Sequence, residues 1–400
     1  MKTSTKLAFT AITSLAVLTA LPTAAKPAAD PRHQPETQPQ VDPPENDNAE
    51  AGPRVQIALL LDTSNSMDGL IDQAKSQLWK VVNTFIDARH EGKAPIVEVA
   101  LYEYGNNGNA VGNDWVRLVS PMTRDLDSLS RQLFALKTNG GEEYCGAVIQ
   151  RALGDLSWDA RESTYKVVFI AGNEPFTQGR VDARSACKEA LAKNIIINTI
   201  HCGSRQEGIN GSWHEGAALA GGDFLVIDQD KAVAHVDAPQ DKRISELSHK
   251  LNETYLGYGK RREEAAANQK IADSDAAQNA EAGAVVQRAV TKASSNYSNA
   301  SWDLCDALEE KKIDLLSLKQ DELPEEMKNI APEKRREFVE QTAAKRALIQ
   351  DEIKQLNKER ETYVADELKK LTDGGDKTLD QAMIEATRKQ ASALGYKFGE

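Results

Sequence analysis

The feature that most constrains this chain is an apolar run at residues 55–61 that is followed at once by oxygen-bearing polar side chains. The run reads V-Q-I-A-L-L-L, which is typical of a central strand buried on both faces of a parallel sheet. Asp62, Ser64 and Ser66 come next, and residues 70–85 then carry apolar side chains at helical spacing. Open α/β sheets bind ligands at the carboxyl ends of their strands, so these three side chains are candidates for a binding site.

The same three side chains suit a metal ion. Carboxylate and hydroxyl oxygens are the ligands that hard cations such as Mg²⁺ prefer. The Asp-x-Ser-x-Ser pattern of Asp62, Ser64 and Ser66, placed between a buried strand and an amphipathic helix, resembles the metal-ion-dependent adhesion site of von Willebrand factor type A (VWA) domains. The alternative is that Asp62 and Ser64 only cap the helix while Ser66 is solvated.

Residues 55–259 alternate predicted strands and helices. After the first strand and helix, strands are predicted at residues 96–104, 115–121, 165–171, 195–201 and 224–228, and helices at residues 125–136, 145–156, 182–193, 212–220 and 244–255. A Gly- and Asn-rich loop at residues 105–113 predicts a hairpin between the second and third strands. The alternation predicts an α/β fold with a doubly wound, mostly parallel sheet and helices on both faces. The resemblance to VWA domains implies the same order and covers about half of the chain.

The resemblance also implies two further loops at the metal site, and both depart from the family pattern here. In the second loop the family has a Thr after two glycines, whereas this chain has Glu142 and Glu143 after its glycine pair. In the third loop Gly172 stands where the family has an Asp, and Glu174 follows two residues later. Glu142, Glu143 and Glu174 are therefore candidate metal ligands.

Two interpretations of the altered loops stay open. In the first, a glutamate of the second loop replaces the missing Asp, and Mg²⁺ or another divalent cation still binds beside Asp62. In the second, the site is free of metal, and the clustered carboxylates are protonated or paired with a base such as Arg180.

The two ends of the chain differ from this central part. Residues 1–25 have Lys2 and Lys6, an apolar run at 7–21 and small residues after it, which predicts a secretory signal peptide. Residues 26–54 are rich in Pro, Asp, Glu, Asn and Gln, which predicts a disordered linker. No later segment has the length of apolar sequence needed to span a bilayer, so the mature chain is expected in the periplasm or outside the cell.

Residues 260–400 form a predicted α-helical region dominated by Ala, Glu, Lys, Gln and Arg. A long helix is predicted at residues 333–371 and a last one at 379–394. The apolar stripe of the long helix is interpreted either as the core of a helical hairpin or bundle, or as a coiled-coil surface for helix-mediated association. Arg346 and Arg360 fall on the stripe, which argues against an extended coiled coil.

Four cysteines suit an exported protein that holds structural thiols or disulfides, and a single bridge is most compatible with Cys187 and Cys202. The pairing rests on a helix starting near residue 182 and a strand ending near residue 201, which would bring both cysteines toward one end of the sheet.

The function predicted from these features is an exported, non-enzymatic adaptor that presents a variant adhesion site to a protein partner. The net charge of −12 argues against nucleic acid as that partner, because phosphate binding requires clustered Lys and Arg. One alternative is a structural protein of the cell envelope that acts through its C-terminal helices. A metal-dependent hydrolase is a third hypothesis, which lacks a convincing base.

Overall fold

The computed structural model describes residues 52–67, 69, 78–227, 236–278, 283–371 and 379–399. The predicted signal peptide and nearly all of the predicted linker lie outside the described residues, as do Leu70, Ile71 and Ala74 of the first predicted helix. Contacts between residues group Ala51–Glu400 into one unit. The predicted division of this unit at residues 259 and 260 stays a prediction.

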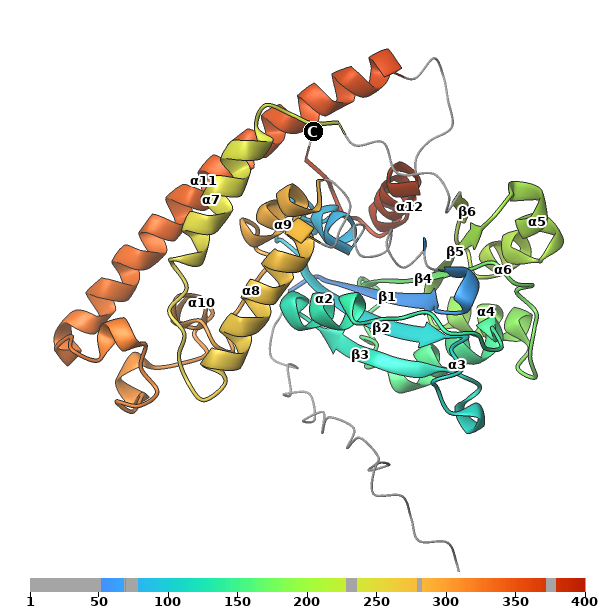
Figure 1. Cartoon of the computed structure of the whole chain (residues 1–400), viewed down its shortest axis with the longest axis horizontal. Helices are drawn as coiled ribbons and strands as arrows, with labels where there is room; N and C mark the ends of the chain where they lie inside the picture. Colours follow the sequence, from blue (N-terminus) through green and yellow to red (C-terminus); the bar gives the residue numbers. More distant parts are fainter. Residues whose placement is uncertain are drawn as a thin grey trace, which may run out of the picture. The chain divides into compact units, whose positions relative to one another are not determined.

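A six-stranded sheet forms the centre of the α/β part (Figure 1). Its strands are β1 (Arg54–Asp62), β2 (Ile96–Tyr104), β3 (Arg117–Thr123), β4 (Tyr165–Gly172), β5 (Ile196–Cys202) and β6 (Phe224–Ile227), in the order β3-β2-β1-β4-β5-β6. Only β3 runs antiparallel to its neighbour, and the other pairs are parallel. The prediction of a doubly wound, mostly parallel sheet with one hairpin is confirmed.

Strand β1 lies in the middle of the sheet, and its residues alternate between two cores. Val55, Ile57 and Leu59 belong to the core on one face, and Ala58 and Leu60 belong to the core on the other face. All five side chains are buried, as a strand covered on both sides requires. The apolar run of the sequence is therefore explained by burial on both faces.

Helices cover the two faces. The α/β part contains α2 (Leu126–Phe134), α3 (Cys145–Asp155), α4 (Ala183–Ala192), α5 (Arg205–Asn210) and α6 (Trp213–Leu219), with the short 3₁₀ turns η1 (Asn65–Met67) and η2 (Val111–Asn113). Helix α7 (Asp241–Asn252) follows them and packs in a separate core, which its Ile244 and Leu247 share with Val286 and Ile353. Asp125 caps α2 by accepting from the backbone N–H of Ser128. Helix α5 was not predicted, although Ser204 and Glu207 form a complete capping box at its start.

The remaining chain is helical, as predicted. It contains α8 (Arg262–Gln278), α9 (Ala284–Lys292), α10 (Leu304–Glu309), α11 (Pro332–Leu371) and α12 (Leu379–Ala393), with the 3₁₀ turns η3 (Leu315–Ser317) and η4 (Glu325–Met327). Helix α8 packs against α2, and Arg288 of α9 forms an ion pair of 2.7 Å with Asp127 of α2. Since Arg288 and Asp127 are both buried, this pair joins the helical region to the α/β part.

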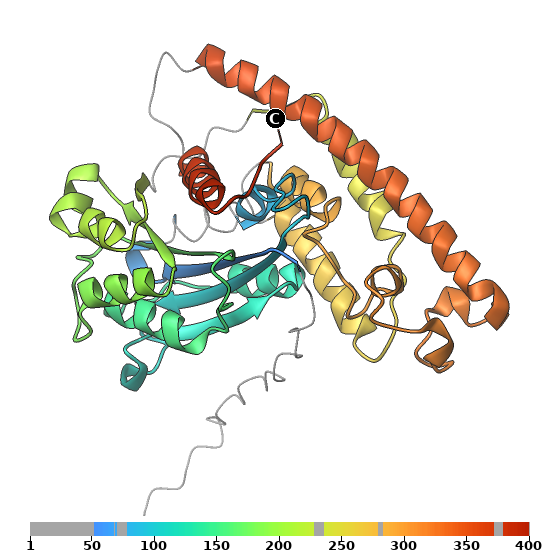
Figure 2. The same ribbon diagram turned by 180° about the vertical axis from the view of Figure 1, so that it is seen from behind.

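Helix α12 returns to the sheet and covers part of one face (Figure 2). Met383 and Ala391 belong to the same core as Val55 of β1. The side-chain amide of Gln390 donates to Asn198 of β5 at 2.8 Å, and its oxygen accepts from Tyr165 of β4 at 2.8 Å. The end of the chain is therefore part of the fold of the α/β domain.

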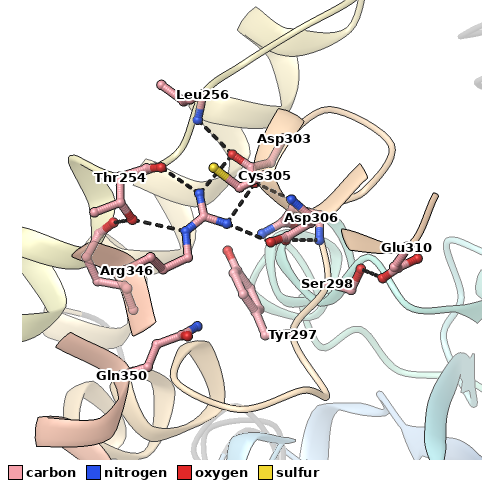
Figure 3. A network of polar contacts seen from close by, with 12 residues as sticks. Thr254, Leu256, Tyr297, Ser298, Asp303, Cys305, Asp306, Glu310, Arg346 and Gln350 are labelled. Carbon is pink, nitrogen blue, oxygen red and sulfur yellow. Dashed lines mark hydrogen bonds and ion pairs between the residues drawn. The ribbon is translucent and has the colours of Figure 1, made fainter. Parts of the chain in front are cut away.

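Helix α11 packs along α7, and its two arginines on the apolar stripe are buried and paired. The guanidinium of Arg346 donates to Asp303, Asp306 and the backbone oxygen of Thr254, at distances of 2.6–3.0 Å (Figure 3). Arg360 forms an ion pair of 2.6 Å with Asp241 of α7. Ile349 and Ile353 of the stripe thus belong to a core within the chain.

The predicted Cys187–Cys202 disulfide is wrong. All four cysteines are free and buried. Cys187 belongs to the core on one face of the sheet and Cys202 to the core on the other face, so the sheet separates their sulfur atoms. Among the described residues, no helix has the length and apolar character needed to cross a membrane.

Candidate metal centre at the carboxyl edge of the sheet

Asp62 is the last residue of β1, and its side chain is fully buried. The backbone N–H of Ser64 donates to its Oδ1 at 2.8 Å. Its Oδ2 is also buried but has no hydrogen-bond partner among the described residues. A buried carboxylate oxygen without a partner is unfavourable, so this atom indicates that the site holds something more than the side chains around it.

Burial raises the pKa of Asp62 to about 7, although hydrogen bonds from Ser64 oppose that rise. The negative charges of Glu143 and Glu174 raise it further. Three carboxyl groups from three loops are therefore close enough to repel one another. A cation or a proton is required to balance them at neutral pH.

The two serine hydroxyls lie beside this carboxylate. Oγ of Ser64 is 3.2 Å from Oγ of Ser66. Ligands of an octahedral Mg²⁺ lie at about 2.1 Å from the ion, which places neighbouring ligands about 3 Å apart. The hydroxyl pair therefore has the spacing of two neighbouring ligands. Ser66 is exposed, so a cation held here would be reached by solvent or by a partner.

The second loop brings Glu143, and not Glu142, to the site. The loop is attached through the backbone N–H of Asn139, which donates to the oxygen of Thr63 at 2.9 Å. Glu143 is half-buried and its side chain approaches Ser64, whereas Glu142 is exposed. Burial raises the pKa of Glu143, and the charge of Glu174 adds to the rise. Of the two glutamates, Glu143 is therefore the better candidate ligand.

Gly105 and Gly172 leave room for these carboxylates. A Cβ on Gly105 would lie 2.8 Å from Oδ1 of Asp62 and 3.0 Å from Cγ of Glu143. Gly105 also has a φ of +76°, which favours glycine. The close approach of the second loop to Asp62 therefore depends on a residue without a side chain.

Tyr104 explains why the third loop lacks the family's aspartate. A Cβ on Gly172 would lie 2.6 Å from the hydroxyl oxygen of Tyr104, which donates to the backbone oxygen of Ala171 at 2.9 Å. The tyrosine therefore fills the space that an aspartate at position 172 would need. Tyr104 was not identified from the sequence, although it ends β2 in register with Asp62.

Two other predictions for this edge have different outcomes. Glu174 is half-buried and accepts from Gln178 at 3.2 Å, and its charge acts on Asp62 without a direct contact between the two side chains. Arg180 does not neutralise the cluster, because it forms an ion pair of 2.9 Å with Asp114 instead. The metal-free interpretation thus loses the base that it invoked.

The residues present fit a hard divalent cation, provided that hydroxyl oxygens and water supply part of the ligand set. In the part of the chain that the structure describes, no three His, Cys, Asp or Glu side chains form a metal site by themselves. Asp62, Ser64, Ser66 and Glu143 together offer two carboxylates and two hydroxyls. This donor set contains oxygen only, which favours Mg²⁺ or Mn²⁺ over softer ions.

No protein-family model matches the chain, and no curated protein matches it. Similar solved structures include the SpRpn10 VWA domain, with 16% identity over 44% of this chain and 88% of that one and a TM-score of 0.33. BatB from Bacteroides thetaiotaomicron has 17% identity over 44% of this chain and 90% of that one, with a TM-score of 0.34. Proximal thread matrix protein 1 from the mussel byssus, solved with a zinc-occupied MIDAS motif, has 14% identity over 45% of this chain and 43% of that one, with a TM-score of 0.34.

These identities and TM-scores are too low to support a statement about activity or partners. The assignment of the fold therefore rests on the strand order of the sheet and on the loops at its carboxyl edge. On that evidence, the chain contains a VWA-like α/β domain followed by a helical region.

Proposed function

We propose that the protein is an exported, non-enzymatic adaptor whose VWA-like domain binds a divalent cation and a protein partner at the carboxyl edge of its sheet. The observation that carries this proposal is the buried carboxylate of Asp62, whose Oδ2 has no hydrogen-bond partner among the described residues. A cation at this atom would relieve the repulsion among Asp62, Glu143 and Glu174. Export is supported by the basic start and apolar run of residues 1–25.

Asp62, Ser64, Ser66 and Glu143 would hold the cation. Two carboxylates in this set would neutralise a divalent ion more fully than one would, so the ion would attract a further carboxylate weakly. Recognition of a partner's acidic side chain through the metal is therefore disfavoured, and the surrounding Glu142 and Glu174 favour a basic partner. The cation would act mainly by fixing the three loops in one arrangement.

The contacts at the serines support a binding role over hydrolysis. The hydroxyls of Ser64 and Ser66 contact each other, and among the described residues no histidine hydrogen-bonds to either of them. A serine nucleophile requires an adjacent general base, and a metal-activated water also requires a group that takes its proton. We therefore keep hydrolysis as the less supported alternative.

The C-terminal helices would serve as a support that fixes the domain. Arg288 and Gln390 attach them to α2 and to the sheet through buried contacts. A structural role in the envelope through these helices remains the second hypothesis. Deleting residues 260–400 would uncover part of the sheet core beneath α12, so point variants of the edge separate the two hypotheses better than truncation does.

Titration calorimetry with Mg²⁺ and with Mn²⁺ tests the cation site. We expect saturable binding by the wild type, loss of binding in Asp62→Ala and strong weakening in Glu143→Gln. Glu142→Gln is the matched control, because it removes the same charge from the neighbouring exposed position and should bind as the wild type does. Absence of binding by the wild type, or equal effects of Glu142→Gln and Glu143→Gln, would contradict the proposal.

Affinity capture from the native envelope tests the adaptor role. The wild type and Asp62→Ala are compared side by side, in Mg²⁺ and in a chelator. The proposal predicts at least one protein that is captured by the wild type and lost with Asp62→Ala. Capture that is unchanged by Asp62→Ala and by the chelator would instead support association through the helices.

A further inference from the structure

A cavity of about 430 Å³ lies beside the proposed cation site, between the third loop and α5. It is lined by Asn173, Pro175, His201, Cys202, Glu207 and Asn210, together with Gly211. His201 pairs with Gly172 across β4 and β5, so the cavity opens at the carboxyl ends of these two strands. None of the residues that line it is a ligand of the proposed cation.

His201 is the polar group of this cavity that most needs a partner. Its side chain is only 3% exposed, and neither ring nitrogen has a hydrogen-bond partner among the described residues. Burial lowers its pKa, so the ring is neutral and has one donor and one acceptor nitrogen. A buried ring with both nitrogens unpaired is unfavourable, so the position indicates a ligand.

Asn173 adds a second unpaired atom and connects the cavity to the cation site. Its Nδ2 donates to Oγ of Ser66 at 3.1 Å, whereas its Oδ1 is buried and has no partner among the described residues. The orientation of this amide is set by Ser66. An acceptor oxygen is thereby held at the cavity wall.

The carboxylate of Glu207 gives the cavity a negative charge. Its Oε2 and Nε2 of His201 both lie within 3.3 Å of the point that a Cβ on Gly203 would occupy. None of the residues that line the cavity is a lysine or an arginine. The nearby Arg184 is paired with Glu215, and Arg205 stacks 5.2 Å from the ring centre of Phe224.

The walls of the cavity are fixed by contacts between the third loop and the turn that joins α5 to α6. The backbone N–H of Phe176 donates to the oxygen of Gly211 at 2.8 Å. Nε1 of Trp213 donates to the backbone oxygen of Glu174, also at 2.8 Å. A ligand would therefore enter a preformed site, which lowers the entropy cost of binding.

We propose that this cavity binds an arginine side chain of a protein partner, held by Glu207, Asn173 and His201. This inference rests on the proposed function, in which the carboxyl edge of the sheet is the binding face. A guanidinium is a planar cation with five N–H donors and no acceptor. It matches a cavity that offers a carboxylate, an amide oxygen and an imidazole nitrogen as acceptors. A carboxylate ligand would be repelled by Glu207, and an apolar one would leave the buried acceptors unpaired.

The test uses a short blocked peptide with one arginine and a matched peptide with citrulline, the neutral analogue of arginine. The full-length protein is labelled with ¹³C at its histidine rings, and the His201 signal is identified with His201→Gln. Titrations are done in EDTA, which removes divalent cations. A negative result then concerns the arginine site alone, and is distinguished from a failure of the cation site. Glu207→Gln removes the charge but keeps a residue that can complete the capping box of α5. Glu189→Gln, which removes one charge from the far end of α4, is the matched control.

We expect the arginine peptide to shift the His201 signal saturably and the citrulline peptide to leave it unchanged. Glu207→Gln should weaken binding about tenfold or more, since it replaces a charge-assisted contact. Glu189→Gln should bind as the wild type does. No saturable shift, equal binding of the two peptides, or equal binding by Glu207→Gln and the wild type would overturn the proposal.

Discussion

The buried carboxylate of Asp62 should destabilise the metal-free protein at neutral pH. The folded state raises the pKa of Asp62 from 3.8 to about 7, chiefly through burial. Because the folded state then binds a proton that the unfolded state has released, the contribution of this group to stability falls as the pH rises from about 4 to about 7 and is constant above that. A rise of about 3 pKa units corresponds to about 4 kcal/mol.

The variant Asp62→Asn isolates this contribution. The amide keeps the size of the side chain and an oxygen that accepts from the backbone N–H of Ser64, but it carries no charge. Its buried N–H groups would lack partners, which offsets about 1–3 kcal/mol of the gain. We therefore expect Asp62→Asn to be about 1–3 kcal/mol more stable than the wild type at about pH 8 without a cation, and no more stable than the wild type at about pH 4.

Urea unfolding followed by tryptophan fluorescence measures these differences. Wild type, Asp62→Asn and the control Glu142→Gln are compared at both pH values in EDTA, and at the higher pH also in Mg²⁺. The difference between wild type and variant is used, because other groups titrate in the same range. Mg²⁺ should stabilise the wild type and not Asp62→Asn. If Asp62→Asn is no more stable than the wild type at the higher pH in EDTA, the reasoning is refuted.

Three further predictions concern other parts of the molecule. Arg346→Met should lower the free energy of unfolding by about 3–5 kcal/mol, because it leaves the buried carboxylate of Asp303 and the half-buried one of Asp306 without their counter-charge. The exposed ion pair of Arg243 should contribute less than about 1 kcal/mol in Arg243→Met, and equal losses of stability to urea in the two variants would contradict this. Gly172→Asp should destabilise the protein without improving its Mg²⁺ affinity, because the new side chain would clash with the hydroxyl of Tyr104. Adding Tyr104→Phe to this variant should partly restore stability. Tighter Mg²⁺ binding by Gly172→Asp at unchanged stability would contradict the clash. The four cysteines are buried thiols with raised pKa values, so a thiol reagent should modify them only after unfolding, and rapid reaction of the native protein would contradict this burial.

Most of the fold could be predicted because burial leaves a periodic pattern in the sequence. Strand β2 has the bounds that its apolar run predicts, and α11 fills the stretch without Gly or Pro that ends at Leu371. Arg346 and Arg360 interrupt the apolar stripe of α11, which argues against an extended coiled coil. Their partners come from distant parts of the chain, so the ion pairs themselves left no local signal.

The candidate site was only partly predictable, because contacts between distant parts of the chain leave no local signal in the sequence. Asp62, Ser64 and Ser66 follow one strand and could be identified together. The choice between Glu142 and Glu143 depends on which of two neighbouring side chains turns toward Ser64, and the sequence does not contain that information. The wrong disulfide arose because nearness along the strand direction was considered without the face of the sheet on which each cysteine lies.

The central claim is that the loop after β1 and the second loop, between α2 and α3, hold a divalent cation. The most direct test is a crystal structure of the protein grown with Mn²⁺, with anomalous scattering used to locate the ion. We predict a single strong peak that contacts the hydroxyl oxygens of Ser64 and Ser66 and lies next to the carboxylates of Asp62 and Glu143. The absence of a peak there, in crystals whose edge residues are free of lattice contacts, would contradict the claim.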